Sequence, residues 1–125
     1  KLVGFTAGLA YASALDAGFS VNAGSVGPTF FGSMAYGANN PMAQFNNVVG
    51  KFLGLSFQGN TGLKYAWVRV DINNALGSFV VRDWAYESTN GVGISTGTIP
   101  GPGALGLLAV GAAGLGRFRS RRDGK

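Results

Sequence analysis

The chain has 125 residues, 22 of them glycine, and contains neither cysteine nor histidine. Disulfides, thiolate metal sites and histidine-dependent catalytic or metal sites are therefore excluded. A formal net charge of +5 would suit nucleic acid, but the charges are unevenly placed. Residues 117–125 hold four arginines and one lysine against one aspartate, whereas the preceding residues hold five basic and four acidic side chains. We therefore expect a nearly neutral domain with a basic C-terminal end, and no nucleic-acid partner.

Residues 1–50 are rich in glycine and small side chains, so their pattern is weak. Residues 3–14 suit either a short strand or a short helix. Residues 19–26 and 29–36 suit strands joined by a turn at Gly27-Pro28, and residues 37–41 suit a loop. Because the chain begins with Lys1 rather than methionine, we expect an export signal upstream. An alternative is that residues 1–14 are themselves the end of a signal peptide.

The middle of the chain has the clearest pattern. Residues 52–58, 63–72 and 78–87 are dense in aromatic and β-branched side chains, and residues 59–62 and 73–77 between them are turn formers. This alternation predicts three successive antiparallel strands.

The register of the second hairpin decides which aromatic side chains share a face. If Ile72 lies opposite Gly77, Trp67 faces Arg82, and one sheet face carries four aromatic rings: Tyr65, Trp67, Trp84 and Tyr86. Such a face could stack on sugar rings, with the arginines bonding to hydroxyl groups. The preferred interpretation is that the rings pack an interior and that Trp67 with Arg82 is a structural cation–π contact. A one-residue slip or a bulge would exchange the faces, and the sequence leaves this open.

The acidic residues give little support to catalysis. Asp83 and Glu87 would lie about 13 Å apart along one strand, too far for a paired-carboxylate site. Residues 71–74 (Asp-Ile-Asn-Asn) could supply oxygen ligands to calcium, but the composition is more typical of a turn. No phosphate-binding glycine loop is present in the sequence. We expect no enzyme activity, no cofactor and no metal site.

The C-terminal 27 residues divide into three parts. Residues 99–103 contain Pro100, Gly101 and Pro102, which break regular structure. Residues 104–116 have no charged or polar side chain and would span about 20 Å as a helix, against roughly 30 Å for the hydrocarbon core of a bilayer. The apolar positions are Ala104, Leu105, Leu107, Leu108, Val110 and Leu115. The basic residues that follow are Arg117, Arg119, Arg121 and Arg122.

This tail predicts a marginal membrane span whose basic end stays in the cytoplasm. The alternatives are a buried C-terminal helix or a disordered Gly/Ala tail. A segment that is apolar on every side does not suit the surface of so small a domain, which favours the membrane.

A Pro-Gly-Pro motif, an apolar segment and an arginine cluster in this order resemble the C-terminal sorting signal of the PEP-CTERM family. Residues 52–57, 65–70 and 83–88 are also similar to a body common in that family. The resemblance implies an exported bacterial protein that an exosortase cuts near the motif and then releases or transfers to the envelope. Pro100 and Pro102 match the motif, whereas Gly101 stands where the family has glutamate. The tail is thus either a variant of the signal or a membrane anchor.

We therefore predict a mainly β protein: an antiparallel β-sandwich-like domain over residues 1–98, followed by a sorting segment over residues 99–125 with a C-terminal hydrophobic transmembrane helix. The predicted function is that of a cell-envelope or extracellular-matrix protein with a structural body. It is held in the inner membrane until an exosortase-type enzyme processes it, and then reaches the cell surface or the medium. The alternative is a carbohydrate-binding module that holds exopolysaccharide at the cell surface.

Overall fold

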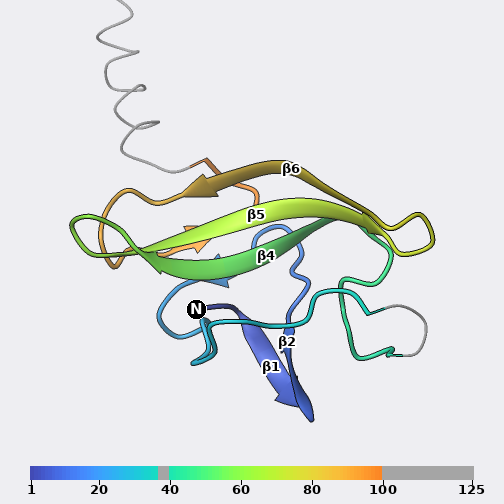
Figure 1. The fold of residues 1–125 in the computed structure, drawn as a ribbon. Coiled ribbons are helices and arrows are strands. Elements are labelled where there is room, and N and C mark those ends of the chain that lie inside the picture. The colour runs from blue at the N-terminus through green and yellow to red at the C-terminus, as the bar shows by residue number, and fades with distance from the viewer. Residues whose placement is uncertain (37–39, 100–125) are drawn as a thin grey trace, which may run out of the picture.

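The computed structural model describes residues 1–36 and 40–99. Its centre is a three-stranded antiparallel sheet in the order β4 (Val48–Gln58), β5 (Leu63–Asn73) and β6 (Ser78–Tyr86) (Figure 1). The three predicted strands are confirmed, although β4 begins at Val48 rather than at residue 52. No helix occurs in the described ranges. The prediction of a mainly β, antiparallel protein is therefore confirmed.

Four shorter strands surround this sheet. β1 (Gly4–Ala7) and β2 (Leu9–Ala12) form a hairpin, and β3 (Ser20–Val21) pairs with β7 (Ile94–Ser95). Single bridges from Leu2 to Leu55 and from Leu15 to Phe52 attach the N-terminal segment to the edge of β4 that does not pair with β5. Residues 3–14, expected to form either one strand or one helix, thus form two short strands of a hairpin.

The strands predicted over residues 19–26 and 29–36 are largely wrong. The first is reduced to β3 because the Asn22 side chain accepts hydrogen bonds from the backbone of Gly24 and Ser25, which turns the chain. The second makes only a single bridge, from Ser33 to Tyr11. Its two phenylalanines, Phe30 and Phe31, are exposed, so no buried face holds this segment in a strand.

One face of the sheet, here called the inner face, is covered. Phe52, Tyr65, Trp67 and Ala85 of this face form a core with four residues from the N-terminal segment, β3 and β7: Val3, Leu15, Val21 and Ile94. The rings of Phe52 and Trp67 meet edge to face at 5.2 Å, and Trp67 Nε1 donates a hydrogen bond to the Thr98 carbonyl at 3.0 Å. The N-terminal segment lies so close that a Cβ on Gly54 would be 2.8 Å from Val3.

The opposite face, here called the outer face, is covered at one end only by the residues that the structure describes. Val70 and Ile72 pack there with Phe45, Val48 and Ala12 in a second apolar cluster. At the other end, where β5 leaves the turn after β4, no comparable cluster of described residues covers the sheet. This open end holds the candidate site.

The predicted register of the β5–β6 hairpin is wrong. Ile72 lies opposite Phe79, not Gly77, and the register shifts by one residue between Arg69 and Val70. This shift is a β-bulge that leaves Arg82 without an opposite residue. Between the turn and the bulge, the side chains of β6 lie on the predicted faces. After the bulge, from Asp83 to Tyr86, they lie on the opposite faces.

Candidate functional site

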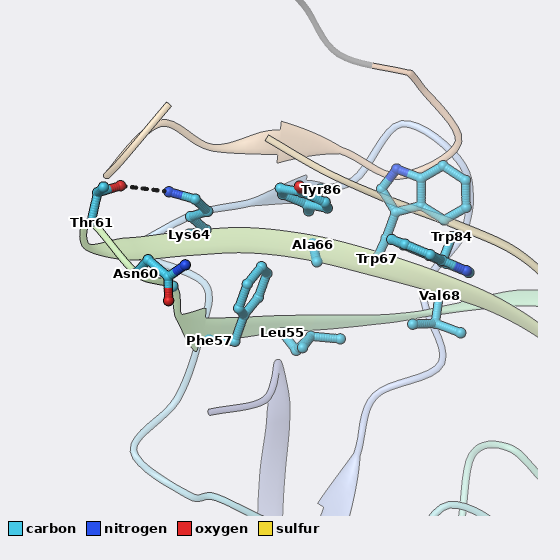
Figure 2. Close-up of a pocket in the computed structure, with 11 residues that line it drawn as sticks. Leu55, Phe57, Asn60, Thr61, Lys64, Ala66, Trp67, Val68, Trp84 and Tyr86 are labelled. Atoms are coloured by element: carbon cyan, nitrogen blue, oxygen red, sulfur yellow. Dashed lines mark hydrogen bonds between the residues drawn. The ribbon is translucent and has the colours of Figure 1, made fainter. Parts of the chain in front are cut away.

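Two aromatic side chains of β6 lie on the open end of the outer face. Trp84 is opposite Val68 and Tyr86 is opposite Ala66, so both rings project from the face that the core leaves uncovered. Trp84 is 61% exposed and Tyr86 is 42% exposed. Their planes are 10° from parallel and their centroids are 6.3 Å apart, and the two rings lie side by side in Figure 2. Together they form a near-parallel aromatic platform.

The platform borders a shallow groove of about 550 Å³. The floor is apolar and comes from Leu55, Ala66 and Val68. Phe57 stands against Tyr86 edge to face, with 5.6 Å between centroids and 79° between planes, and so supports the Tyr86 ring from β4 (Figure 2). Because Ala66 lies directly opposite Tyr86, its small side chain leaves space in the groove.

Polar groups gather at one end of the groove, around the turn between β4 and β5. Lys64 Nζ donates to Asn90 Oδ1 at 2.6 Å and to Thr61 Oγ1 at 3.3 Å, a contact drawn in Figure 2. Asn90 Nδ2 in turn donates to the Thr61 carbonyl at 2.7 Å. Asn60 is exposed beside this cluster and also lines the groove. The turn requires Gly62, where a Cβ would lie 2.7 Å from the Asn90 side chain.

The four aromatic residues named in the sequence analysis do not share a face. Tyr65 and Trp67 are 3% and 2% exposed and belong to the inner core, whereas Trp84 and Tyr86 lie on the outer face. The expected contact between Trp67 and Arg82 is also wrong, because the two residues are not opposite each other. The bulge at Arg82 is the reason that the rings are divided between the two faces. Trp67 is not opposite Arg82 because the hairpin pairs Ile72 with Phe79, two residues away from the predicted register.

Four charged residues of the hairpin pair with one another. Arg69 Nε donates to one oxygen of Asp83 at 2.7 Å and Arg69 Nη2 donates to the other, while Arg82 lies 3.5 Å from Asp71. The hydrogen bond from Arg69 lowers the pKa of Asp83 below its usual value and raises the pKa of Arg69. Arg69 also stands over the Phe52 ring, at 5.7 Å. Because Arg69 and Phe52 are opposite each other on the inner face, these ion pairs do not line the groove.

The oxygens considered for calcium are used within the fold. Asp71 Oδ1 accepts the Gly50 amide at 2.7 Å, Asn73 Oδ1 accepts the Leu76 amide, and Asn74 Oδ1 accepts the Asn47 amide. Among the residues that the structure describes, no three acidic side chains are placed to hold a metal ion together. Asn73 therefore closes the turn before β6, whereas Asp71 and Asn74 join β5 and this turn to residues 47–50.

The residues of the sorting segment lie outside the described part of the chain, apart from residue 99. They include Pro100, Gly101 and Pro102, the apolar positions between Ala104 and Leu115, and the arginines between Arg117 and Arg122. Within the part that is described, the chain contains no helix of the length and apolar character that a membrane span needs.

Phe57, Thr61 and Lys64 belong to the site but were not found from the sequence. Phe57 and Lys64 are opposite each other across the first hairpin, and the four-residue turn formed by residues 59–62 was a signal that could have placed them together. No family model, curated protein or solved structure matches the chain.

Proposed function

We propose that the chain is an exported carbohydrate-binding protein whose sugar site is the Trp84–Tyr86 platform and its groove. The near-parallel, solvent-facing pair of rings is the observation that carries this proposal. Large aromatic side chains usually have their surface covered in a small soluble domain, and an exposed apolar patch marks an interaction site. The apolar C–H face of a sugar ring complements an aromatic ring, and adjacent rings suit neighbouring units of a polysaccharide.

The rest of the groove supports a polar, uncharged ligand. Asn60 and Thr61 present an amide and a hydroxyl, which can bond to sugar hydroxyls. Lys64 is the single charged residue among the described residues that line the groove, and its ammonium group is already bonded to neutral partners. A groove that is apolar along its length and polar at one end is typical of ligand sites where a few polar groups fix orientation.

The proposal includes the location of the protein. The body is a sandwich-like domain outside the cytoplasm, residues 104–116 are a membrane helix, and the arginines that follow keep the C-terminus inside. Processing near Pro100 and Pro102 by an exosortase-type enzyme then delivers the body to the surface. We propose no catalytic role, since neither cysteine nor histidine is available.

Sugar binding can be tested by affinity electrophoresis of the full chain in gels that contain hydroxyethylcellulose, galactomannan or dextran. We expect at least one polysaccharide to retard the chain, and Trp84→Ala to weaken this affinity about tenfold, which corresponds to ~1.4 kcal/mol. Phe31→Ala is the matched control, because Phe31 is 72% exposed and does not line the groove. Retention by none of the gels, or retention that Trp84→Ala does not change, would rule out this site.

The tail can be tested separately by fusing residues 99–125 to an exported reporter protein. The fusion should fractionate with membranes, because the apolar segment partitions into lipid and the arginines oppose full translocation. Replacing Arg117, Arg119, Arg121 and Arg122 by glutamine should reduce retention. A reporter that stays soluble with the native tail would contradict the anchor.

A further inference from the structure

Another exposed apolar feature of the described residues is the free edge of β6. In the described ranges, β6 pairs through its backbone with β5 alone, so its other edge carries unpaired N–H and C=O groups. Three residues in its first half are about half exposed: Phe79, Val80 and Val81 at 55%, 51% and 50%. The strand contains no proline or lysine, which commonly protect such an edge.

The sequence of β6 is complementary to itself when two copies are laid antiparallel. With the centre between Arg82 and Asp83, Arg82 of one copy lies opposite Asp83 of the other, which joins opposite charges. Val81 then lies opposite Trp84, and Phe79 lies opposite Tyr86. Pairs of aromatic and β-branched residues and pairs of opposite charge are those that stabilise neighbouring strands.

The bulge makes this register consistent on both faces. Directly opposite residues of paired strands must project from the same face. Phe79 is opposite Ile72 and Val81 is opposite Val70, so both lie on the outer face with Trp84 and Tyr86. Val80 and Ala85, the remaining pair, both lie on the inner face, opposite Asp71 and Trp67. Without the bulge, the outer-face residues of one copy would meet inner-face residues of the other.

We infer that two copies of the chain pair through β6, antiparallel and about a two-fold axis, to form one continuous six-stranded sheet. A bulge can protect the edge of a sheet from pairing. Here each copy carries its bulge at the centre of the proposed register, so the two-fold axis relates the two bulges to each other. The dimer does not depend on sugar binding. It places Phe79 and Val81 of one copy beside the aromatic platform of the other, so that the two platforms become one extended surface.

Disulfide trapping tests both the dimer and its register, because the native chain has no cysteine. Val81→Cys and Trp84→Cys, one of them carrying a size tag, are mixed as full chains in mild detergent and oxidised. We expect the mixed product to form about tenfold faster than either self-linked product, because pairing raises the effective concentration of opposite thiols. Phe79→Cys with Tyr86→Cys tests the same register without changing Trp84.

The matched control pair is Leu76→Cys with Trp84→Cys. Leu76 is 78% exposed, as accessible as any β6 residue, but it lies in the turn before β6 and outside the proposed register. If both test pairs link no faster than this control, the dimer is ruled out. If Val81→Cys links to itself as fast as to Trp84→Cys, the register is ruled out. Since no sugar is present, neither result depends on the proposed function.

Discussion

The two faces of the central sheet carry the same kinds of aromatic residue and use them differently. Tyr65 and Trp67 on the inner face are sealed under β3, β7 and the N-terminal segment. Trp84 and Tyr86, on the neighbouring strand, stand in solvent on the outer face. A single extra residue, Arg82 at the bulge, separates the two pairs. Residue type and spacing therefore make an aromatic residue available for binding only where the local register also directs its ring to the open face.

The largest expected effect that tests this comparison is on stability. Trp67→Ala removes a fully buried ring together with its contact to Phe52 and its hydrogen bond to Thr98. We expect the free energy of unfolding to fall by about 3–5 kcal/mol. Trp84→Ala removes an exposed ring and should cost less than about 1 kcal/mol. Urea denaturation followed by far-UV circular dichroism measures both values.

The two tryptophan variants are each other's control, because each removes one indole from one face. Should Trp67→Ala prevent folding altogether, Trp67→Phe provides a graded version of the same test. Equal losses of stability for the Trp67 and Trp84 variants would mean that the two faces are equally covered, and the platform would then not be open to a ligand.

The strands of the sheet could be predicted from sequence because their signals are local. Residues 59–62 and 73–77 are turn formers, and the segments between them are rich in residues that favour strands. Strict alternation counted from the turn also accounts for the placement of Val70 and Ile72 on one face with Phe79 and Val81. These residues lie between the last turn and the bulge, where the alternation is uninterrupted.

The site could be predicted only in part, because two of its causes are not local. A bulge adds one residue and exchanges every later side chain between faces, and no residue type marks its position in this sequence. Which face the core covers depends on how Val3, Leu15 and Val21 dock from a distant part of the chain. Trp84 and Tyr86 were therefore found as candidates, but their separation from Tyr65 and Trp67 needed the structure.

A smaller effect should distinguish the two faces by pH. The charged groups of the inner face are bonded to one another, whereas Lys64 on the outer face is bonded to neutral Asn90 and Thr61. The hydrogen bond from Arg69 lowers the pKa of Asp83 in the folded state. Asp83 therefore adds stability at pH values above its unfolded-state pKa of about 3.9. This contribution is lost as the pH falls through the lower, folded-state pKa.

The measurement is the difference in free energy of unfolding between the native chain and Asp83→Asn, taken by urea denaturation from pH 7 down to pH 2. We expect a small difference at neutral pH, because the Arg69–Asp83 pair is partly exposed and solvent screens it. The difference should shrink below about pH 4, as the native carboxylate takes up a proton. Lys64→Met is the outer-face control, and its difference from the native chain should stay constant over the same range because its partners carry no carboxylate. If the difference for Asp83→Asn does not change with pH, the Asp83 carboxylate is not held by Arg69. The expected contrast between the paired charges of the inner face and the neutral partners of Lys64 would then be wrong.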